Sequence, residues 1–212
     1  MSEAGSEPGR GASRARSLRL ARADDAAGIS AVYAPSVTDA VTSFEMTPPT
    51  ADEMRQRLAK VQPALPWLVC EANGQVAGYA YASRHHERAA YQWSLDCAVY
   101  IASEQRRTGV GRALYKTLFE LLTLQGYHAV HAGVTLPNAA SVGLHEAFGF
   151  RPVAVYPKVG YKFGAWHDVG WWQLELRERR AEPLPPRTAE VVAAEQPEAW
   201  AAAFAAGQRL LG

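Results

Sequence analysis

Apolar and polar positions change their spacing several times along the chain, which predicts helices alternating with strands. After possible caps at Asp24 or Asp25, apolar residues recur at helical spacing, so we expect a helix over about residues 26–33 that Pro35 limits. A second cap at Thr50 precedes another amphipathic segment. The stretch GVGRALYKTLFELLTLQG predicts a helix that ends at its last glycine, and NAASVGLHEAFGF predicts a short helix that ends at the glycine before its last residue.

Strand patterns occupy the segments between these helices. The runs WLVCEA and QVAGYAYAS flank Asn73-Gly74, which is the strongest short hairpin signal in the chain. YQWSLDCAVYI and HAVHAGV are further predicted strands, and the aromatic stretch YKFGAWHDVGWWQLEL closes the region with β structure. The pattern therefore predicts an α/β or α+β sandwich around one mixed sheet.

The organised region is expected to span residues 18–177 as one domain. Residues 1–17 have no apolar segment after their charges, so they are not a secretory signal and are predicted to form a disordered leader. Residues 178–212 include PLPP and an Ala/Glu-rich stretch, and we expect a linker and a marginal helix that packs only with a partner.

The composition limits which partners the protein can bind and in which compartment we expect it. Lys+Arg 22 against Asp+Glu 21 leaves a net charge of +1, so no general field attracts nucleic acid or an anionic membrane, and we expect neither partner. No apolar run approaches the roughly 20 residues needed to cross a bilayer. Cys70 and Cys97 lie far apart and form no CxxC unit, which fits a cytoplasmic protein. Any anion must therefore bind locally.

The stretch QRRTGVGR follows a predicted strand and begins a predicted helix. Gly109 and Gly111 let backbone amides approach a ligand, and the helix start adds unpaired N–H groups. Arg106, Arg107 and Arg112 add guanidinium donors suited to a pyrophosphate. The stretch lacks the Gly-Lys-Ser/Thr ending of a Walker A loop and the third glycine of the dinucleotide fingerprint. It predicts a phosphate-binding turn, and the alternative is a plain turn with a solvated basic face.

Arg106, Gly109 and Gly111 match the Arg/Gln-x-x-Gly-x-Gly/Ala turn of the GNAT superfamily of acetyl-CoA-dependent N-acetyltransferases, which this chain resembles from Leu18 to Leu176. It is most similar to the phosphinothricin N-acetyltransferase branch, whose segments appear in the same order as TSFEMTPPT, PWLVCEANGQVAGYAYA, AYQWSLDCAVYI, QRRTGVGRALY, LPNAASVGLHEAFGF and GYKFGAWHDVGWWQLEL. The resemblance implies a mixed, mostly antiparallel sheet flanked by helices and splayed at two central parallel strands, where a bulge occurs. It also implies a homodimer.

What the resemblance implies for the chemistry is direct attack of a substrate amine on the acetyl thioester in a ternary complex. The amine must first lose a proton, and the base of the family is a carboxylate at the position of Asp96. Strand alternation places Asp96, Ala98 and Tyr100 on one face. The branch usually has glutamate here, so the shorter Asp96 acts either directly or through a bridging water; alternatively, it is a carboxylate satisfied by a cap or an arginine.

The acid that protonates the departing thiolate has two candidates. His145 stands where the wider superfamily commonly has a tyrosine, and the branch also has histidine there. Tyr115, on the helix after the phosphate-binding turn, is the second candidate. Packing in the aromatic core is the alternative for both residues.

The resemblance implies acetyl-CoA as the co-substrate, with the amide near Val99 polarising the thioester carbonyl. Asn138 matches a contact to the pantetheine arm and is also a helix cap. The full expected acetyl-CoA site contains Val99, Ile101, Arg106, Arg107, Thr108, Gly109, Val110, Gly111, Arg112, Asn138 and Ser141.

Recognition of a small amino-acid-like amine, phosphinothricin or methionine sulfoximine or a relative, is also implied by resemblance. Arg88 is suited to a carboxylate or phosphinate, and His86 replaces a basic residue of the branch two positions earlier, which favours substrates other than phosphinothricin. The expected substrate site contains Phe44, Arg88, Tyr91, Tyr100 and Val169, the last reaching the partner's site.

The same residues give weaker support to other functions. A different amine, such as another amino acid, a polyamine or a peptide N-terminus, is an alternative substrate, and a non-catalytic CoA-binding module is an alternative class. A thiol enzyme built on Cys97 is disfavoured because strand alternation turns Cys97 away from the Asp96 face. We expect no metal site, because His85 and His86 are adjacent and would point to opposite faces of a strand.

Overall fold

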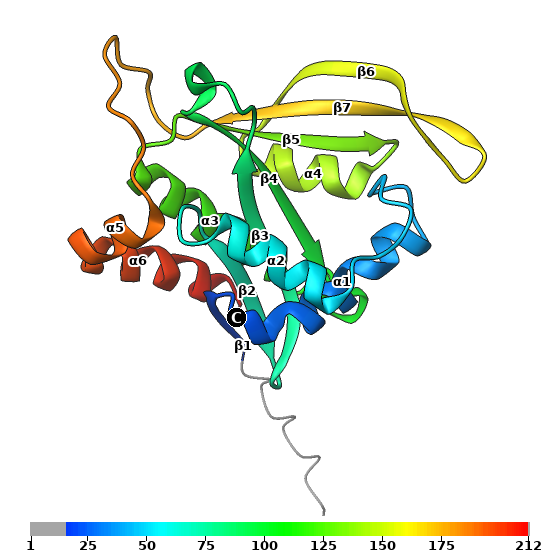
Figure 1. Ribbon diagram of the computed structural model, residues 1–212, viewed down its shortest axis with the longest axis horizontal. Coiled ribbons are helices and arrows are strands. Elements are labelled where there is room, and N and C mark those ends of the chain that lie inside the picture. The colour runs from blue at the N-terminus through cyan, green and yellow to red at the C-terminus, as the bar shows by residue number, and fades with distance from the viewer. Residues whose placement is uncertain (1–15, 212) are drawn as a thin grey trace, which may run out of the picture.

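A computed structural model describes residues 16–211, and the predicted leader up to residue 15 lies outside them (Figure 1). The strands are β1 (Arg16–Leu20), β2 (Trp67–Ala72), β3 (Gln75–Arg84), β4 (Ser94–Ile101), β5 (Ala129–Leu136), β6 (Arg151–Lys162) and β7 (Ala165–Glu175). The α-helices are α1 (Ala26–Thr38), α2 (Ala51–Val61), α3 (Val110–Gln125), α4 (Ala139–Ala147), α5 (Ala189–Glu195) and α6 (Pro197–Gln208). Strand β1 starts at Arg16, so Arg16 and Ser17 belong to the sheet and not to the leader.

The strands form one mixed sheet in the order β1-β2-β3-β4-β5-β7-β6, in which only β4 and β5 are parallel neighbours among the described strands. That parallel pairing covers three residue pairs and ends at Asp96 opposite His131. Beyond this point β4 stays paired with β3 and β5 stays paired with β7, so the two central strands separate. The predicted class, a mostly antiparallel mixed sheet splayed at two central parallel strands, is confirmed.

The expected bulge at the splay is wrong for the β3–β4 ladder. Its register is continuous from Gly78 opposite Ile101 to Arg84 opposite Leu95. The strands separate because each follows its own antiparallel partner while the sheet twists. No extra residue is inserted in β4 to open the sheet.

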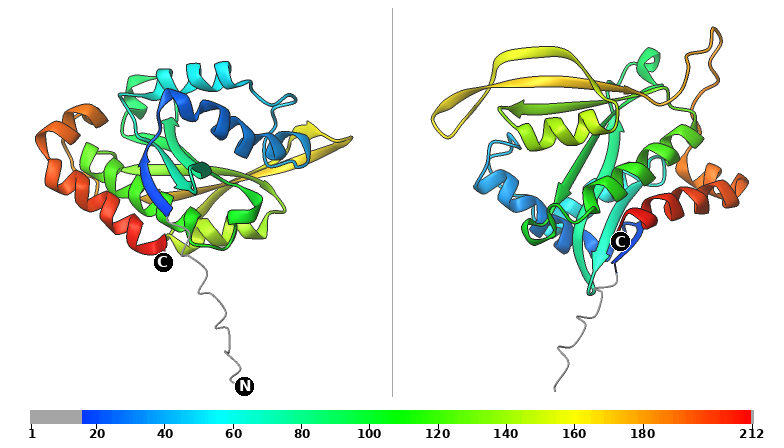
Figure 2. Two further views of the ribbon diagram at one scale, coloured as in Figure 1. Left: turned by 90° about the horizontal axis from the view of Figure 1, so that it is seen from below. Right: turned by 180° about the vertical axis from the view of Figure 1, so that it is seen from behind.

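Helices cover both faces of the sheet. Helices α1 and α2 pack on one face, where Ile29, Tyr33, Met54, Leu58 and Trp67 form part of a buried cluster. Helix α3 packs on the other face, with α6 beside it, and Figure 2 shows the sheet between these two layers. The sheet residues that face α3 are apolar as well, so the central strands are buried on both faces.

Local signals placed several element ends correctly. Thr50 caps α2 in a capping box with Glu53, whose amide donates to Thr50 Oγ1 at 3.2 Å. Asn73 and Gly74, with φ of 54° and 75°, form the tight turn between β2 and β3. Gly126, with φ of 98°, ends α3 in the left-handed conformation that glycine adopts without strain.

Helix α1 does not end before Pro35, as the pattern predicts, but continues to Thr38. Two tertiary contacts stabilise the helix beyond the proline. Val37 is buried in the core, and the buried ammonium of Lys162 from β6 donates to the carbonyls of Val37 at 2.7 Å, Ala40 at 3.1 Å and Ser43 at 2.7 Å. The cation satisfies carbonyls at the negative end of the helix and ties the β6–β7 hairpin to the loop after α1.

Most of strand β6 lies outside the predicted elements, and only its last two residues, Tyr161 and Lys162, fall in the predicted aromatic β stretch. It contains Pro152 and Pro157 and lies at the edge of the sheet, where a missing N–H costs no ladder hydrogen bond. Most of its side chains are exposed, so it lacks the alternation of a half-buried strand. Near its end, Gly160 leaves room for the ring of Phe44, which packs where a side chain at this position would lie.

The C-terminal segment packs within the chain, whereas the composition predicts packing only with a partner. Helix α6 lies along α3, and Ala203, Gly207 and Leu211 are buried. The side chain of Gln208 accepts from the amide of Leu18 at 3.0 Å and donates to the Arg16 carbonyl, so the segment also covers the free edge of β1.

Gly207 is the contact point between α6 and α3, and Gly207→Ala is expected to destabilise the protein. A methyl group there would meet Thr117 Oγ1 and would lie 2.6 Å from the Ala113 carbonyl oxygen. We expect the free energy of unfolding to fall by about 1–3 kcal/mol in urea denaturation. The matched helical control is Gly143→Ala, which meets nothing within 4 Å and should gain about 0.5–1 kcal/mol. Equal effects of the two substitutions would contradict this packing.

Candidate active site

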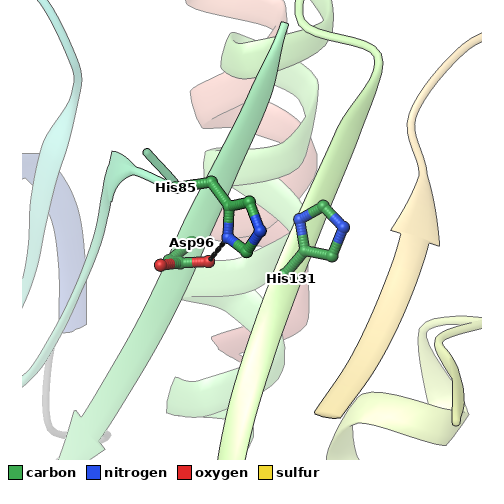
Figure 3. Close-up of side chains that lie close together, drawn as sticks. All are labelled: His85, Asp96 and His131. Carbon is green, nitrogen blue, oxygen red and sulfur yellow. Dashed lines mark hydrogen bonds and ion pairs between the residues drawn. The ribbon is translucent and has the colours of Figure 1, made fainter. Parts of the chain in front are cut away.

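The point where β4 and β5 separate brings together three polar side chains, shown in Figure 3. Asp96 of β4 accepts a hydrogen bond from His85 Nδ1 at 2.7 Å. His131 of β5 lies opposite Asp96 in the parallel ladder, and its ring stacks on that of His85 with centroids 4.4 Å apart. Beyond Asp96, the β5-facing edge of β4, which includes Val99 and Ile101, has no strand partner among the described residues. A carboxylate and two imidazoles therefore stand at the start of an unpaired strand edge.

The phosphate-binding turn lies at the other end of β4. Ile101 is the fifth residue after Asp96 along the strand, a distance of about 16 Å at normal strand rise. Gly109 has φ of 90° and directly precedes α3. Two carbonyls of the turn are engaged, because Thr108 Oγ1 donates to Gln105 at 2.6 Å and Arg16 Nη1 donates to Thr108 at 3.2 Å. These contacts hold the backbone of the turn in place.

The first amides of α3, in the turn that Val110, Gly111 and Arg112 occupy, have no acceptor within the helix. Gly111 and Arg112, unlike the buried Val110, reach the surface. Arg106, Arg107 and Arg112 are exposed, and within residues 16–211 none of them forms an ion pair. Free amides, a helix dipole and unpaired guanidinium groups together suit a phosphate or pyrophosphate.

His145 and Tyr115, the two acid candidates, form one hydrogen-bonded pair. His145 Nδ1 lies 2.8 Å from the Ser141 carbonyl, which can only accept, so Nδ1 carries the ring proton. Nε2 then accepts from the Tyr115 hydroxyl at 3.0 Å. Burial raises the pKa of Tyr115 well above its usual value and lowers the pKa of His145. The pair is therefore neutral at physiological pH, with one proton aligned from Tyr115 toward His145.

The buried His145 makes stability depend on pH. Its pKa lies below the ordinary 6.5, mainly because burial disfavours the imidazolium. Between the lowered pKa and 6.5 the unfolded chain binds more protons at this residue than the folded protein, so the free energy of unfolding falls as the pH falls through that window. We expect His145→Gln to lose less stability than the wild type between about pH 7.5 and about pH 5.5 in urea titrations. Parallel losses in both proteins would contradict the assignment.

Asn138 and Ser141 flank this pair at the start of α4. The Ser141 amide donates to Asn138 Oδ1 at 3.1 Å, so Asn138 caps the helix through its oxygen. Its amide NH₂ takes part in no hydrogen bond within the described chain. Capping and ligand contact are therefore compatible at this residue.

The expected substrate residues come from four segments, and of these residues Tyr100 shares the Asp96 face of β4 while Tyr91 lies near the ring of His85. Tyr100 packs edge-on against Tyr33 with centroids 4.8 Å apart and lies on the face of the sheet that α1 and α2 cover. Phe44 and Tyr91 are exposed, and exposed Arg88 precedes the 3₁₀ turn Ala89–Tyr91. Val169 is half-buried in β7 opposite Thr135 of β5 within the same chain.

Cys97 faces the opposite side of β4, as the alternation predicts. It is part of the core under α3, and burial raises its pKa to about 12. A thiol held in that state supplies no thiolate at neutral pH. Both cysteines are free and buried.

The prediction that His85 and His86 point to opposite faces of a strand is wrong. Strand β3 ends at Arg84, so neither histidine lies in a strand, and their rings meet edge-on with centroids 4.5 Å apart. The sequence prediction does not single out His131, although a histidine in the middle of the predicted strand HAVHAGV is a visible signal. Nothing local in the sequence links it to His85, because the contact depends on the pairing of β4 with β5.

Comparisons with known proteins agree with this fold. The family model described as an acetyltransferase (GNAT) domain matches residues 18–171. A phosphinothricin N-acetyltransferase of Streptomyces viridochromogenes is 38% identical over 80% of this chain and 91% of its own. An L-methionine sulfoximine/L-methionine sulfone acetyltransferase of Pseudomonas paraeruginosa is 34% identical over 79% of this chain and 98% of its own.

A solved structure shares the architecture. The crystal structure of a phosphinothricin acetyltransferase from Sinorhizobium meliloti in complex with AcCoA superposes with a TM-score of 0.76 at 33% identity, covering 80% of this chain and 93% of its own. The splayed sheet and the glycine turn before α3 define an acyl-transfer enzyme. The chain belongs to the GNAT acetyltransferase family.

Proposed function

We propose that this enzyme transfers the acetyl group of acetyl-CoA to the amine of a small amino-acid-like substrate, such as phosphinothricin or methionine sulfoximine. The observation that carries the proposal is the position of Asp96, at the point where β4 and β5 separate and one strand length from the phosphate-binding turn. The similarity to enzymes named for these two substrates supports the substrate class. Residues 18–177 form the acetyltransferase domain in this proposal.

The free amides at the start of α3 and the three exposed arginines fit the phosphates of acetyl-CoA. The unpaired edge of β4 provides backbone donors near Val99 for the thioester carbonyl. Asn138 has a free NH₂ group for the pantetheine arm. The acetyl-CoA site comprises Val99, Ile101, Arg106, Arg107, Thr108, Gly109, Val110, Gly111, Arg112, Asn138 and Ser141.

The amine lies on the Asp96 face of the sheet. Asp96 promotes loss of the ammonium proton, the free amine attacks the acetyl carbon, and the carbon–sulfur bond breaks. Tyr115 and His145 supply the proton that the thiolate needs. Phe44, Arg88, Tyr91, Tyr100 and Val169 surround the substrate, with Arg88 pairing with its carboxylate or phosphinate.

We also propose that the protein is a cytoplasmic homodimer. No helix among the described residues is long and apolar enough to cross a membrane. Edge strand β6, its hairpin partner β7 and the turn between them expose large apolar side chains that a second copy would cover; these are Val153, Val155, Tyr156, Val159, Tyr161, Phe163 and Trp166. Sedimentation equilibrium tests this through the mass in solution, which for a dimer is twice 23.1 kDa.

Initial rates of CoA thiol release test the activity. Acetyl-CoA is varied against phosphinothricin, methionine sulfoximine, the standard amino acids, a polyamine and a peptide with a free N-terminus. We expect turnover with one or more small amino acids and a kinetic pattern typical of a ternary complex. Turnover of the polyamine or the peptide alone would reassign the substrate, and binding of acetyl-CoA without turnover of any amine would favour a CoA-binding module.

A further inference from the structure

His85 has one ring nitrogen on a carboxylate and the other free. The bond from Nδ1 to Asp96 Oδ1 is 2.7 Å long, and an ionised carboxylate only accepts, so Nδ1 is the donor. In the neutral imidazole Nε2 then carries a lone pair. Nε2 takes part in no hydrogen bond within residues 16–211. A carboxylate that fixes the tautomer of a histidine and leaves Nε2 free is the arrangement of a general-base pair.

We propose that His85 and Asp96 act together as the general base, with Nε2 of His85 taking the proton of the substrate ammonium and Asp96 holding the ring. This rests on the proposed acetyl transfer. The imidazole extends the reach of the short Asp96 side chain, and it replaces the bridging water that an aspartate at this position would otherwise need.

The surroundings of His85 suit this role. The titratable groups packed around it are Asp96 from β4, His131 from β5, and His86 and Tyr91 from the segment after β3. Burial lowers the pKa of His131, and the neighbouring His85 lowers it further, so His131 stays neutral when His85 takes up a proton. His131 Nδ1 also lies 3.3 Å from the Leu95 carbonyl, which orients its ring. His131 is thus a positioning residue that stacks on His85.

The same three side chains each offer a ligand atom for a metal ion, and these atoms lie within 4.8 Å of one another. The ring planes of His85 and His131 differ by only 20° in a stacked arrangement. Their nitrogen lone pairs lie in those nearly parallel planes and do not converge on one point, as ligands of a metal ion must. The geometry therefore favours proton transfer over metal binding.

The proton balance of the step is complete. The ammonium loses one proton to Nε2, and the imidazolium is stabilised by Asp96 and later releases this proton to water. The amine nitrogen then forms a bond with the acetyl carbon, and the carbon–sulfur bond breaks with its electron pair on sulfur. The thiolate takes a proton from the Tyr115–His145 pair, the second nitrogen proton passes to solvent, and the pair regains one proton from solvent. The products are therefore the amide, CoA thiol and one proton.

Kinetics of His85→Gln test the proposal, since glutamine can still donate to Asp96 but cannot take up a proton. We expect kcat/KM for the amine to fall about 100-fold near neutral pH, with acetyl-CoA affinity unchanged. The defect should shrink above the pKa of the substrate amine, because the free amine needs no base. The control is Glu87→Gln, an exposed residue of the same segment that contacts Arg84 at 3.6 Å, and it should behave as the wild type.

A loss that is equal at all pH values would indicate a merely structural role and overturn the proposal, as would full activity of His85→Gln. A chelator added to each assay should change nothing, and loss of wild-type activity on chelation would favour the metal site instead.

A nitrogen NMR spectrum of His85 decides the question independently of any amine. The wild type should show a protonated Nδ1 and an unprotonated Nε2, and Asp96→Asn should lose this preference. The same tautomer in both proteins would exclude the pair. If the wild type acetylated no amine while the tautomer shifted as expected, the failure would lie with the proposed function and not with the dyad.

Discussion

Asp96→Ala is expected to lower kcat/KM for the amine by about 100- to 10,000-fold while the dissociation constant for acetyl-CoA stays unchanged. The reason is positional. Asp96 lies where β4 and β5 part, a strand length away from the turn that fits the phosphates. The substitution removes the partner of His85 Nδ1 without touching that turn.

Thiol-release kinetics and calorimetric titration of acetyl-CoA measure the two quantities separately. Asp24→Ala is the control, because Asp24 is exposed and forms no ion pair in the described part of the chain. Turnover of Asp96→Ala at the wild-type rate would refute a role for this carboxylate. Loss of acetyl-CoA affinity in the same variant would mean that the substitution disturbs the arrangement of β4 and β5 at the point where they separate.

Joint replacement of Arg106, Arg107 and Arg112 by alanine is expected to raise KM for acetyl-CoA by about 10- to 100-fold and to change kcat little. These guanidinium groups are exposed and unpaired in the described structure, so their removal leaves no buried charge and should not unfold the protein. The backbone amides at Gly109 and Gly111 remain, which is why some affinity should persist.

A truncated donor provides the matched control for this variant. Acetyl-pantetheine carries the thioester but lacks the pyrophosphate, so the wild type and the triple variant should use it equally well. Steady-state kinetics with both donors measure the difference. An equal loss with acetyl-pantetheine would contradict phosphate binding by the arginines.

The elements that could be predicted from the sequence are those with a signal inside their own segment. Thr50 and Glu53 form a capping box, and Asn73-Gly74 is a turn sequence with little conformational choice. The end of α1 depends instead on Lys162, which is far away in the sequence and is buried against carbonyls of the last turn of the helix and of the loop after it. Strand β6 shows no alternation because it is an exposed edge strand.

The candidate site also has parts with a local sequence signal and parts that depend on distant segments. The phosphate-binding turn is one continuous stretch, so the glycines and arginines that define it are visible together. The proximity of His85, Asp96 and His131 depends on three segments and on the register of β4 against β5. The sequence shows no partner for Asp96, so it predicts either direct action of this carboxylate or a bridging water. Only the folded structure shows that His85 lies beside it.

Mass spectrometry of the reaction product tests the central claim most directly. The enzyme is incubated with isotopically labelled acetyl-CoA and either phosphinothricin or methionine sulfoximine. We expect the label on the amine nitrogen of at least one of these compounds, formed in step with CoA thiol release. Release of CoA with the label only in free acetate, or no consumption of acetyl-CoA at all, would contradict acetyl transfer to this class of substrate.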